Sequence, residues 1–167
     1  MFLAKSEPLE VTDLSAQVYV NLRLNFTVGS LMITVALPKG SLLKESIQIL
    51  KTAGLDFSGF LEKGTRQLQL TDRSGQARGL LVRAKEVPEY VEYGQAQLGI
   101  VGYDVLRERQ PKVAQISDLG FGGCHLSVAV STDSGYQSAV DLPPLCRLAS
   151  TFVNSSRLYF QSLVLAV

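Results

Sequence analysis

Residues 79–106, GLLVRAKEVPEYVEYGQAQLGIVGYDVL, constrain the fold of this chain more than any other stretch. They contain two apolar runs, residues 80–82 and 98–101, and between the runs Pro88 and Gly94 suit the first position and the stop of a short helix. Strands that are apolar on both faces and alternate with helices are typical of a parallel sheet that is covered on each side. The stretch therefore predicts strand, helix, strand and helix in an α/β domain.

Each apolar run ends at residues that suit a ligand-binding edge. Arg83 follows the first run directly, and the second run breaks at Gly102 and leads into Asp104. Ligands of open α/β sheets bind beyond the carboxyl ends of the strands, which lie together at one edge of the sheet. The sequence therefore predicts that these three residues line one wall of a ligand-binding cleft.

Composition and charge exclude several classes of function. The 167 residues are 46% hydrophobic and carry a formal net charge of +1, a balance that gives no argument for a nucleic-acid or membrane partner. No apolar run approaches the roughly 18 residues that a membrane helix needs. Cys124 and Cys146 are too few for a disulfide framework and too far apart for a metal-binding knuckle, so we expect reduced thiols in a cytoplasmic protein.

Residues 1–31 are expected to be a poorly ordered N-terminal extension. They lack the ordered basic start, apolar centre and cleavage site of a signal peptide. Met32 stands just before the first strong strand pattern, which makes it a candidate for the true start of translation. An additional strand at the alternating residues 18–24 is the alternative.

The organised part of the chain is expected to begin with a strand, a tight turn and a helix. Residues 33–37 are apolar and β-branched, the turn reads Pro-Lys-Gly-Ser, and residues 42–53 carry leucine and isoleucine at helical spacing. The unpaired N–H groups at a helix start suit a phosphate, and Lys39 adds a full positive charge. Alone the pattern is weak, because a lysine in such a turn is more often a solvated surface residue.

Two further segments extend this pattern. Residues 65–70 alternate polar and apolar side chains, which predicts a strand with one solvated face in a hairpin with the strand that begins at Gly79. Arg66 would project from the solvated face, where a surface ion pair explains it as well as substrate binding does. The glycine-dense residues 118–124 predict a hinge between two lobes, with a β-bulge as the alternative.

The remainder of the chain predicts more α/β structure. Strands are expected at residues 113–116, 126–130 and 148–150, followed by a helix that is capped at residues 154–156. Residues 163–167 form an apolar run without a turn or a cap. We therefore expect a strand at this end and a chain that is cut short at its C-terminus.

Five motifs in order carry a resemblance to a known family: ITVALPKGSLL, TRQLQL, LLVRAKEVPEYVEYG, QLGIVGYDVL and DLGFGGCHLSVAV. With these motifs, residues 32–161 resemble the ATP phosphoribosyltransferases, enzymes of the first step of histidine biosynthesis, and are most similar to the short form found in cyanobacteria. The resemblance implies an α/β, two-lobed fold like that of the type II periplasmic binding proteins. The first lobe would span residues 32–119, and residues 120–167 would form an incomplete second lobe.

The resemblance also implies a reaction and a site. Such enzymes join N1 of the ATP adenine to C1 of phosphoribosyl pyrophosphate, while Mg²⁺ assists the departure of pyrophosphate. The resemblance implies that the cations Lys39, Arg66 and Arg83 would hold polyphosphate oxygens. Gly40 would let the backbone come close to the substrate. Gly102 and Asp104 would shape the wall of the cleft, Asp104 by binding substrate or by capping its helix. We identify no general base, no other catalytic residue and no metal ligands of the protein.

The short form of the family implies a partner, a regulatory subunit that resembles histidyl-tRNA synthetase. The sequence also departs from the family, because the loop that holds the 5-phosphate of phosphoribosyl pyrophosphate, Thr-Gly-x-Thr-Leu after an acidic-apolar strand, has no counterpart among the 167 residues. We therefore expect little or no catalysis by this chain alone. An inert remnant or subunit-interaction fragment is the alternative, and a solute-binding module, which would predict an export signal, is another.

Overall fold

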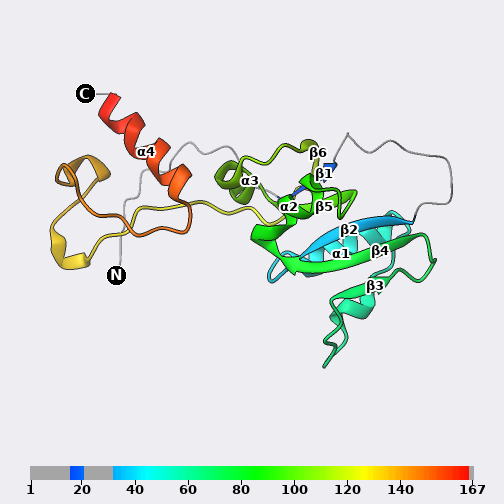
Figure 1. The fold of residues 1–167 in the computed structure, drawn as a ribbon. Helices are drawn as coiled ribbons and strands as arrows, with labels where there is room; N and C mark the ends of the chain where they lie inside the picture. The colour runs from blue at the N-terminus through cyan, green and yellow to red at the C-terminus, as the bar shows by residue number, and fades with distance from the viewer. Residues whose placement is uncertain (1–15, 21–31, 166–167) are drawn as a thin grey trace.

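The computed structural model describes residues 16–20 and 32–165 of the chain (Figure 1). Four short 3₁₀ helices are η1 (Ser58–Leu61), η2 (Ala84–Glu86), η3 (Thr132–Ser134) and η4 (Ala139–Asp141). The strands and α-helices are, in chain order, β1 (Ala16–Val20), β2 (Ile33–Lys39), α1 (Leu43–Thr52), β3 (Gln69–Thr71), β4 (Ala77–Arg83), α2 (Val87–Glu92), β5 (Leu98–Gly102), α3 (Tyr103–Arg109), β6 (Ala114–Asp118) and α4 (Val153–Leu165).

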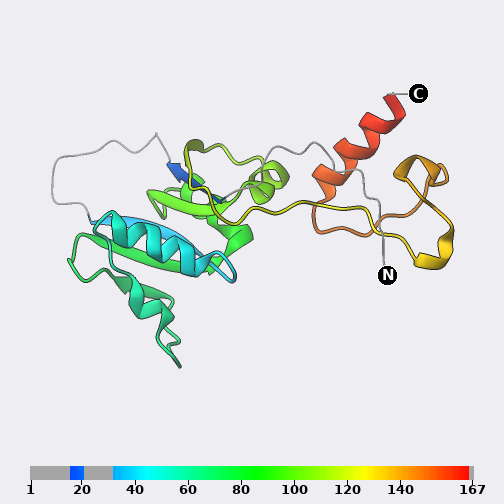
Figure 2. The same ribbon diagram turned by 180° about the vertical axis from the view of Figure 1, so that it is seen from behind.

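The six strands form one sheet in the order β3-β4-β2-β5-β1-β6. β2 lies parallel to β4 and to β5, which confirms the parallel centre that the apolar runs predicted. β3 pairs with β4 in the predicted antiparallel hairpin, and β1 lies antiparallel between β5 and β6. Helix α1 covers one face of the sheet: it lies behind β2 and β4 in Figure 1 and in front of them in Figure 2. The chain thus has the predicted α/β class.

Two apolar cores cover the two faces of this sheet, because side chains alternate along each strand. Val35 and Leu37 of β2 face one side, and Ala36 between them faces the other. The α1-side core consists of Val35, Leu37, Ile47, Phe57, Phe60, Ala77 and Ile100. The α2-side core consists of Ala36, Val82, Val87, Val91, Ala96, Val101 and Leu106. The strand ends are therefore held between two packed layers.

Gly99 allows α2 to pack directly on β5. A Cβ atom at this position would lie 2.8 Å from Val87 Cγ1 and 2.8 Å from Val91 Cγ2, both on α2. Both valines are fully buried, so neither can move aside without displacing its neighbours. The glycine therefore fixes the distance between the helix and the strand that carries Gly102.

We expect Gly99→Ala to lower the free energy of unfolding by about 1 to 3 kcal/mol, the usual cost of overpacking a closed core. Urea denaturation followed by circular dichroism measures this change. Gln95→Ala is the control, because Gln95 is exposed in the turn that precedes β5, and a change there should stay within about 0.5 kcal/mol. Equal stabilities of the two variants would mean that α2 does not pack against Gly99 as described.

Asp72 organises the turn between β3 and β4. Its side chain is buried, with Oδ1 accepting a hydrogen bond from Ala77 N at 2.7 Å and Oδ2 accepting one from Ser74 N at 2.8 Å. Burial by itself raises the pKa of the Asp72 carboxyl, but hydrogen bonds from the Ser74 hydroxyl and from the backbone N–H groups outweigh it and hold the pKa below its usual 3.8. The charged form is thus the one that the fold stabilises.

Asp72→Asn should therefore destabilise the protein at pH 7 by about 1 to 3 kcal/mol, because a charged acceptor of several hydrogen bonds is lost. Since the folded pKa is depressed, the contribution of Asp72 is complete above the unfolded value and disappears as the pH falls through the folded one. The stability difference between the wild type and Asp72→Asn should shrink between pH 7 and pH 2 in urea titrations. A difference that is independent of pH would contradict this assignment.

The chain after β6 is mostly irregular until it reaches α4. Residues 119–152 contain η3 and η4 and, in the described part of the chain, no strand. Figures 1 and 2 show this segment running away from the sheet before α4 begins. Among the described elements, α4 packs mainly against α3.

Several predictions for individual segments are wrong, and each fails for a non-local reason. Residues 126–130 and 148–150 are irregular where strands were predicted, because no strand of the described chain lies beside them to pair with their backbone groups. The apolar residues 163–165 belong to α4, whose hydrogen bonds close within the helix itself. Ala16–Val20 is a paired strand, which overlaps the alternative strand at residues 18–24 and differs from the poorly ordered extension that was expected. The other residues of 1–31 lie outside the described chain.

Candidate functional site

Three strands end side by side at one edge of the sheet, which we call the carboxyl edge. Lys39 of β2 is the register partner of Arg83 of β4. On the other side of β2, Ala36 pairs with Gly99, and both strands continue three residues beyond this pair, to Lys39 and Gly102. Arg83, Lys39 and Gly102 therefore form a row of three strand ends at one edge, as the rule for strand ends predicted.

The two cations of this row project from the same face. Leu37 belongs to the α1-side core and Leu81 packs against it, and each stands two residues before a cation of its own strand. Since side chains alternate along a strand, Lys39 and Arg83 point to the α1 side as well. Two like charges on paired neighbours repel each other, so the arrangement favours an anion that bridges them.

Existing partners of these cations leave them available to a ligand. Arg83 Nη1 lies 3.4 Å from Glu86 Oε1, but the Arg83 side chain is 73% exposed, and such solvated pairs contribute at most about 1 kcal/mol. Within the described residues, no acidic side chain lies at ion-pair distance from the exposed Lys39. A phosphate that binds at this edge would therefore displace only the weak pair between Arg83 and Glu86.

The turn after β2 leaves space above the backbone. Gly40 has a φ of +117°, a conformation that favours glycine, and apart from its two chain neighbours no residue lies within 4 Å of where its Cβ would be. Helix α1 follows with Leu42 as its N-cap, which makes no side-chain capping hydrogen bond. The first N–H groups of α1 therefore lie at the carboxyl edge without the usual side-chain cap, next to Lys39.

Arg66 lies on the chain that leads into β3. β3 runs antiparallel to β4, and Leu81 N donates a hydrogen bond to Leu68 O at 2.8 Å. The chain before Leu68 therefore runs toward the end of β4 that carries Arg83. Arg66 is exposed and lies on a connecting segment, not on the strand that was predicted for it. Its place at the carboxyl edge stays a prediction.

Asp104 lies over the end of β5. It occupies the first turn of α3, and a Cβ at Gly102 would collide with the Asp104 carboxylate oxygen Oδ1. Gly102 is two residues after Ile100 of the α1-side core, so this carboxylate lies on the same face as the two cations. Burial, and to a smaller extent the charge of Asp104, raise the pKa of the Cys124 thiol.

The glycine-rich residues 118–124 cross beside this site. Leu119 and Phe121 pack against the α1-side core, and Gly120 and Gly122 both have a φ of +69°. β6 ends at Asp118, so the glycines turn the chain out of the sheet and do not form a bulge within it. The predicted hinge remains a prediction.

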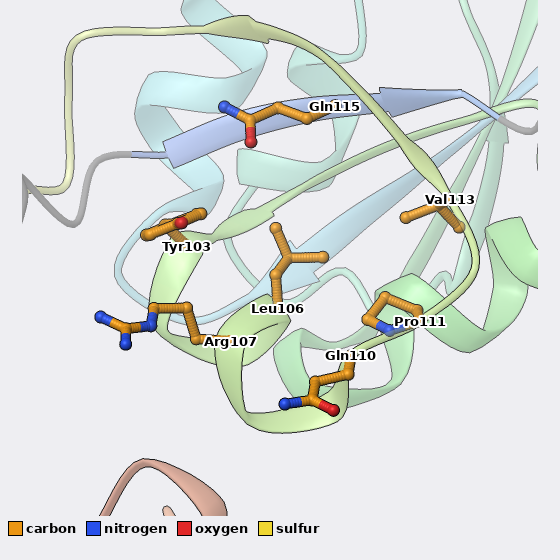
Figure 3. A pocket seen from close by; sticks show the side chains of 7 residues that line it. All are labelled: Tyr103, Leu106, Arg107, Gln110, Pro111, Val113 and Gln115. Carbon is orange, nitrogen blue, oxygen red and sulfur yellow. The ribbon is translucent and has the colours of Figure 1, made fainter. Parts of the chain in front are cut away.

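A separate hollow lies near α3 and β6, on the α2 side of the sheet (Figure 3). Its volume is about 210 Å³, below the several hundred Å³ of a typical small-molecule pocket. Leu106 at its base belongs to the α2-side core, whereas the cation row lies on the α1 side. The sequence had no signal for it, because its lining comes from separate elements: Tyr103, Leu106, Arg107, Gln110, Pro111, Val113 and Gln115.

Two further properties bear on function. Among the residues that the structure describes, no three His, Cys, Asp or Glu side chains gather in a group that could hold a metal ion. None of the described helices has the length and apolar character needed to cross a membrane.

Comparisons with known proteins agree with the family resemblance that the five motifs indicated. The family model for HisG, ATP phosphoribosyltransferase, matches residues 83–167, slightly more than half of the chain. ATP phosphoribosyltransferases of Trichormus variabilis and Nostoc punctiforme are each 64% identical over 136 residues, which cover 81% of this chain and 62% and 64% of those proteins. The protein of Synechococcus elongatus is 62% identical over the same length and is covered to 62%.

A solved structure is similar to part of the chain. It is the ATP phosphoribosyl transferase (HisG:HisZ) complex from Thermotoga maritima, with 29% identity and a TM-score of 0.42 over 52% of this chain and 39% of that one. The chain thus spans less than two thirds of the relatives that it matches in sequence. On the family model and these identities, the chain belongs to the ATP phosphoribosyltransferase family.

Proposed function

We propose that this chain supplies the polyphosphate-binding edge of an ATP phosphoribosyltransferase, which joins ATP and phosphoribosyl pyrophosphate to give phosphoribosyl-ATP and pyrophosphate. Membership of the family supports the reaction. The observation that carries the proposal is the pairing of Lys39 with Arg83 on the α1 side of the carboxyl edge.

The reaction requires that negative charge be stabilised at this edge. Displacement at C1 of the ribose passes through a cationic sugar centre, while negative charge builds up on the departing pyrophosphate. Lys39 and Arg83 would hold that charge in fixed positions, with Arg66 at the outer side of the row. The turn at Gly40 would bring backbone N–H groups to a phosphate oxygen. Holding both substrates in line is the other contribution of the protein, and no covalent intermediate is needed.

Asp104 would have a different role in the same row. Its carboxylate lies over Gly102 on the face that carries the cations. A carboxylate repels phosphate oxygens but accepts hydrogen bonds from hydroxyl groups. We therefore assign Asp104 to a substrate hydroxyl and not to a polyphosphate. We assign no general base.

Mg²⁺ would arrive on the phosphate oxygens of the substrates. The described residues offer no three-residue group of metal ligands, and Mg²⁺ commonly binds through substrate phosphates with one or two carboxylates. When bound, the ion would neutralise charge on the departing pyrophosphate. The residues of this chain would then position the substrate that carries it.

A two-lobed arrangement would complete the site. Residues 32–119 would be the first lobe of a fold like the type II periplasmic binding proteins, and residues 120–167 would begin the second, with the glycine-rich crossing as the hinge. The resemblance of the motifs to the short form of the family supports this arrangement. It also supports a cytoplasmic hetero-oligomer with a regulatory subunit that resembles histidyl-tRNA synthetase.

Isothermal titration of the purified chain with phosphoribosyl pyrophosphate and Mg²⁺ tests this proposal. We expect saturable binding that weakens as salt is added, because charge attraction provides the affinity. Product formation from ATP, followed by chromatography, should be slight for this chain, since the Thr-Gly-x-Thr-Leu loop has no counterpart in it. Absence of binding would favour the inert-fragment alternative, and full turnover would refute the assigned need for that loop.

A further inference from the structure

The N-terminus of α4 is held by a side chain from another helix. Glu108 of α3 places its carboxylate over the start of α4, where Oε1 accepts a hydrogen bond from Asn154 N at 2.9 Å and Oε2 accepts one from Ser155 N at 3.0 Å. The Ser155 hydroxyl donates to Oε2 at 3.1 Å. In return, Asn154 Nδ2 donates to the main-chain oxygen of Glu108 at 2.9 Å.

This contact has the chemistry of a helix cap supplied from a distance. The first N–H groups of a helix lack partners within it, and the helix dipole favours a negative charge there. Glu108 satisfies two of these N–H groups with a charged acceptor, although it stands 46 positions before Asn154. Burial by itself raises the pKa of Glu108, but hydrogen bonds from the start of α4 outweigh it and lower the pKa, so the carboxylate stays charged.

Apolar packing contributes less to the position of α4 than it does within the sheet domain. Val153 is 52% exposed and Leu158 is 48% exposed, whereas Phe57 and Leu37 under the sheet are fully buried. The 34 residues between Asp118 and Val153 contain only η3 and η4 as regular structure in the described chain. Segments with few buried apolar contacts open locally before the rest of a protein does.

We propose that Glu108 is a releasable latch. While its carboxylate caps α4, residues 119–165 are attached to the sheet domain at two places, the crossing at Leu119 and Phe121 and the start of α4. When the cap opens, α4 separates as a unit while the sheet stays folded. Because Asp104 and Glu108 stand one turn apart on α3, the latch sets how the segment after the sheet lies beside the candidate site.

Hydrogen–deuterium exchange of the full chain, read by mass spectrometry, tests the latch without any ligand, so its outcome is separate from that of the proposed function. Glu108→Ala should speed exchange in residues 153–160 by about tenfold to a hundredfold, the range expected for losing charge-assisted hydrogen bonds. Peptides from β2 and β5 should change by less than about twofold. Glu108→Gln keeps an acceptor oxygen without the charge. Exchange of residues 153–160 in this variant should lie between that of the wild type and that of Glu108→Ala.

Arg109→Gln is the matched control on the same helix. It removes the pair between Arg109 Nη1 and Glu89 Oε1, 3.5 Å apart, and should leave exchange in α4 unchanged. Unchanged exchange of α4 in Glu108→Ala would overturn the proposal, and so would an equal increase in β2 and β5, because α4 would then not open separately. Should Glu108→Ala fail to fold, the same comparison in Glu108→Gln and in Glu108→Asp, which keeps the charge but shortens the side chain, decides in the same way.

Discussion

Replacing both Lys39 and Arg83 with alanine should weaken the binding of phosphoribosyl pyrophosphate with Mg²⁺ by at least about a hundredfold, because each charge-assisted hydrogen bond contributes about 1.5 to 3 kcal/mol. Each single variant should lose about tenfold or more. Isothermal titration at fixed ionic strength measures both losses. The double variant should also show a weaker dependence of affinity on salt concentration, since fewer charges face the ligand.

Arg78→Ala is the matched control for this experiment. Arg78 is an exposed arginine on the same strand, β4, but it stands near the opposite end of that strand. An odd number of positions separates it from Arg83, so it projects from the other face of the sheet. Affinity should therefore be unchanged in Arg78→Ala. Equal losses in Arg78→Ala and in the Lys39→Ala or Arg83→Ala single variants would mean that only the total charge of the protein matters.

Phe57→Ala should lower the free energy of unfolding by about 3 to 5 kcal/mol, the largest stability change that we expect from one substitution in this chain. The Phe57 ring is fully buried in the α1-side core, with its centroid 6.3 Å from that of Phe60. A Cβ at Gly79 would lie 3.0 Å from Phe57 Cδ1, so the ring also packs closely on β4. Its removal leaves a cavity beneath the strand that ends at Arg83.

Leu61→Ala is the control for the core prediction. Leu61 ends the same short helix, η1, as Phe60, but it is 45% exposed, so its truncation should cost less than about 1 kcal/mol. Urea denaturation at pH 7 compares the two variants. If Phe57→Ala cost no more than Leu61→Ala, residues 57–61 would not pack under the sheet in solution.

The central part of the fold follows from local patterns. The continuous apolar runs before Arg83 and Gly102 predicted β4 and β5, because buried parallel strands need apolar side chains on both faces. Pro88 and Gly94 marked α2, since one fits a first helical turn and the other has a φ of +74° just after the helix. These signals lie within a few residues of the elements that they define.

The other elements depend on partners that are distant in sequence. β1 is a strand because it pairs with β5 on one side and with β6 on the other. The residues of Ala16–Val20 do not themselves indicate that a position between these two strands is open to them. Residues 126–130 have a strand-like composition but no strand beside them among the described residues. Composition alone therefore predicted a strand at residues 126–130, although no neighbouring strand of the described chain is there to pair with it.

The candidate site divides in the same way. That Lys39, Arg83 and Gly102 lie at strand ends could be predicted from the chain order, because parallel strands end at one edge. That Lys39 and Arg83 are direct register neighbours required the pairing itself. The contact of Glu108 with α4 had no sequence signal, since its two sides stand 46 positions apart.

A titration of the ¹⁵N-labelled chain with phosphoribosyl pyrophosphate and Mg²⁺, followed by backbone amide NMR, tests the central claim most directly. We predict that the largest chemical-shift changes fall on the carboxyl edge, at Gly40, Ser41, Arg83 and Gly102. Changes centred on the hollow between Tyr103 and Gln115, with the carboxyl edge unaffected, would contradict the claim that this row of cations grips the polyphosphate.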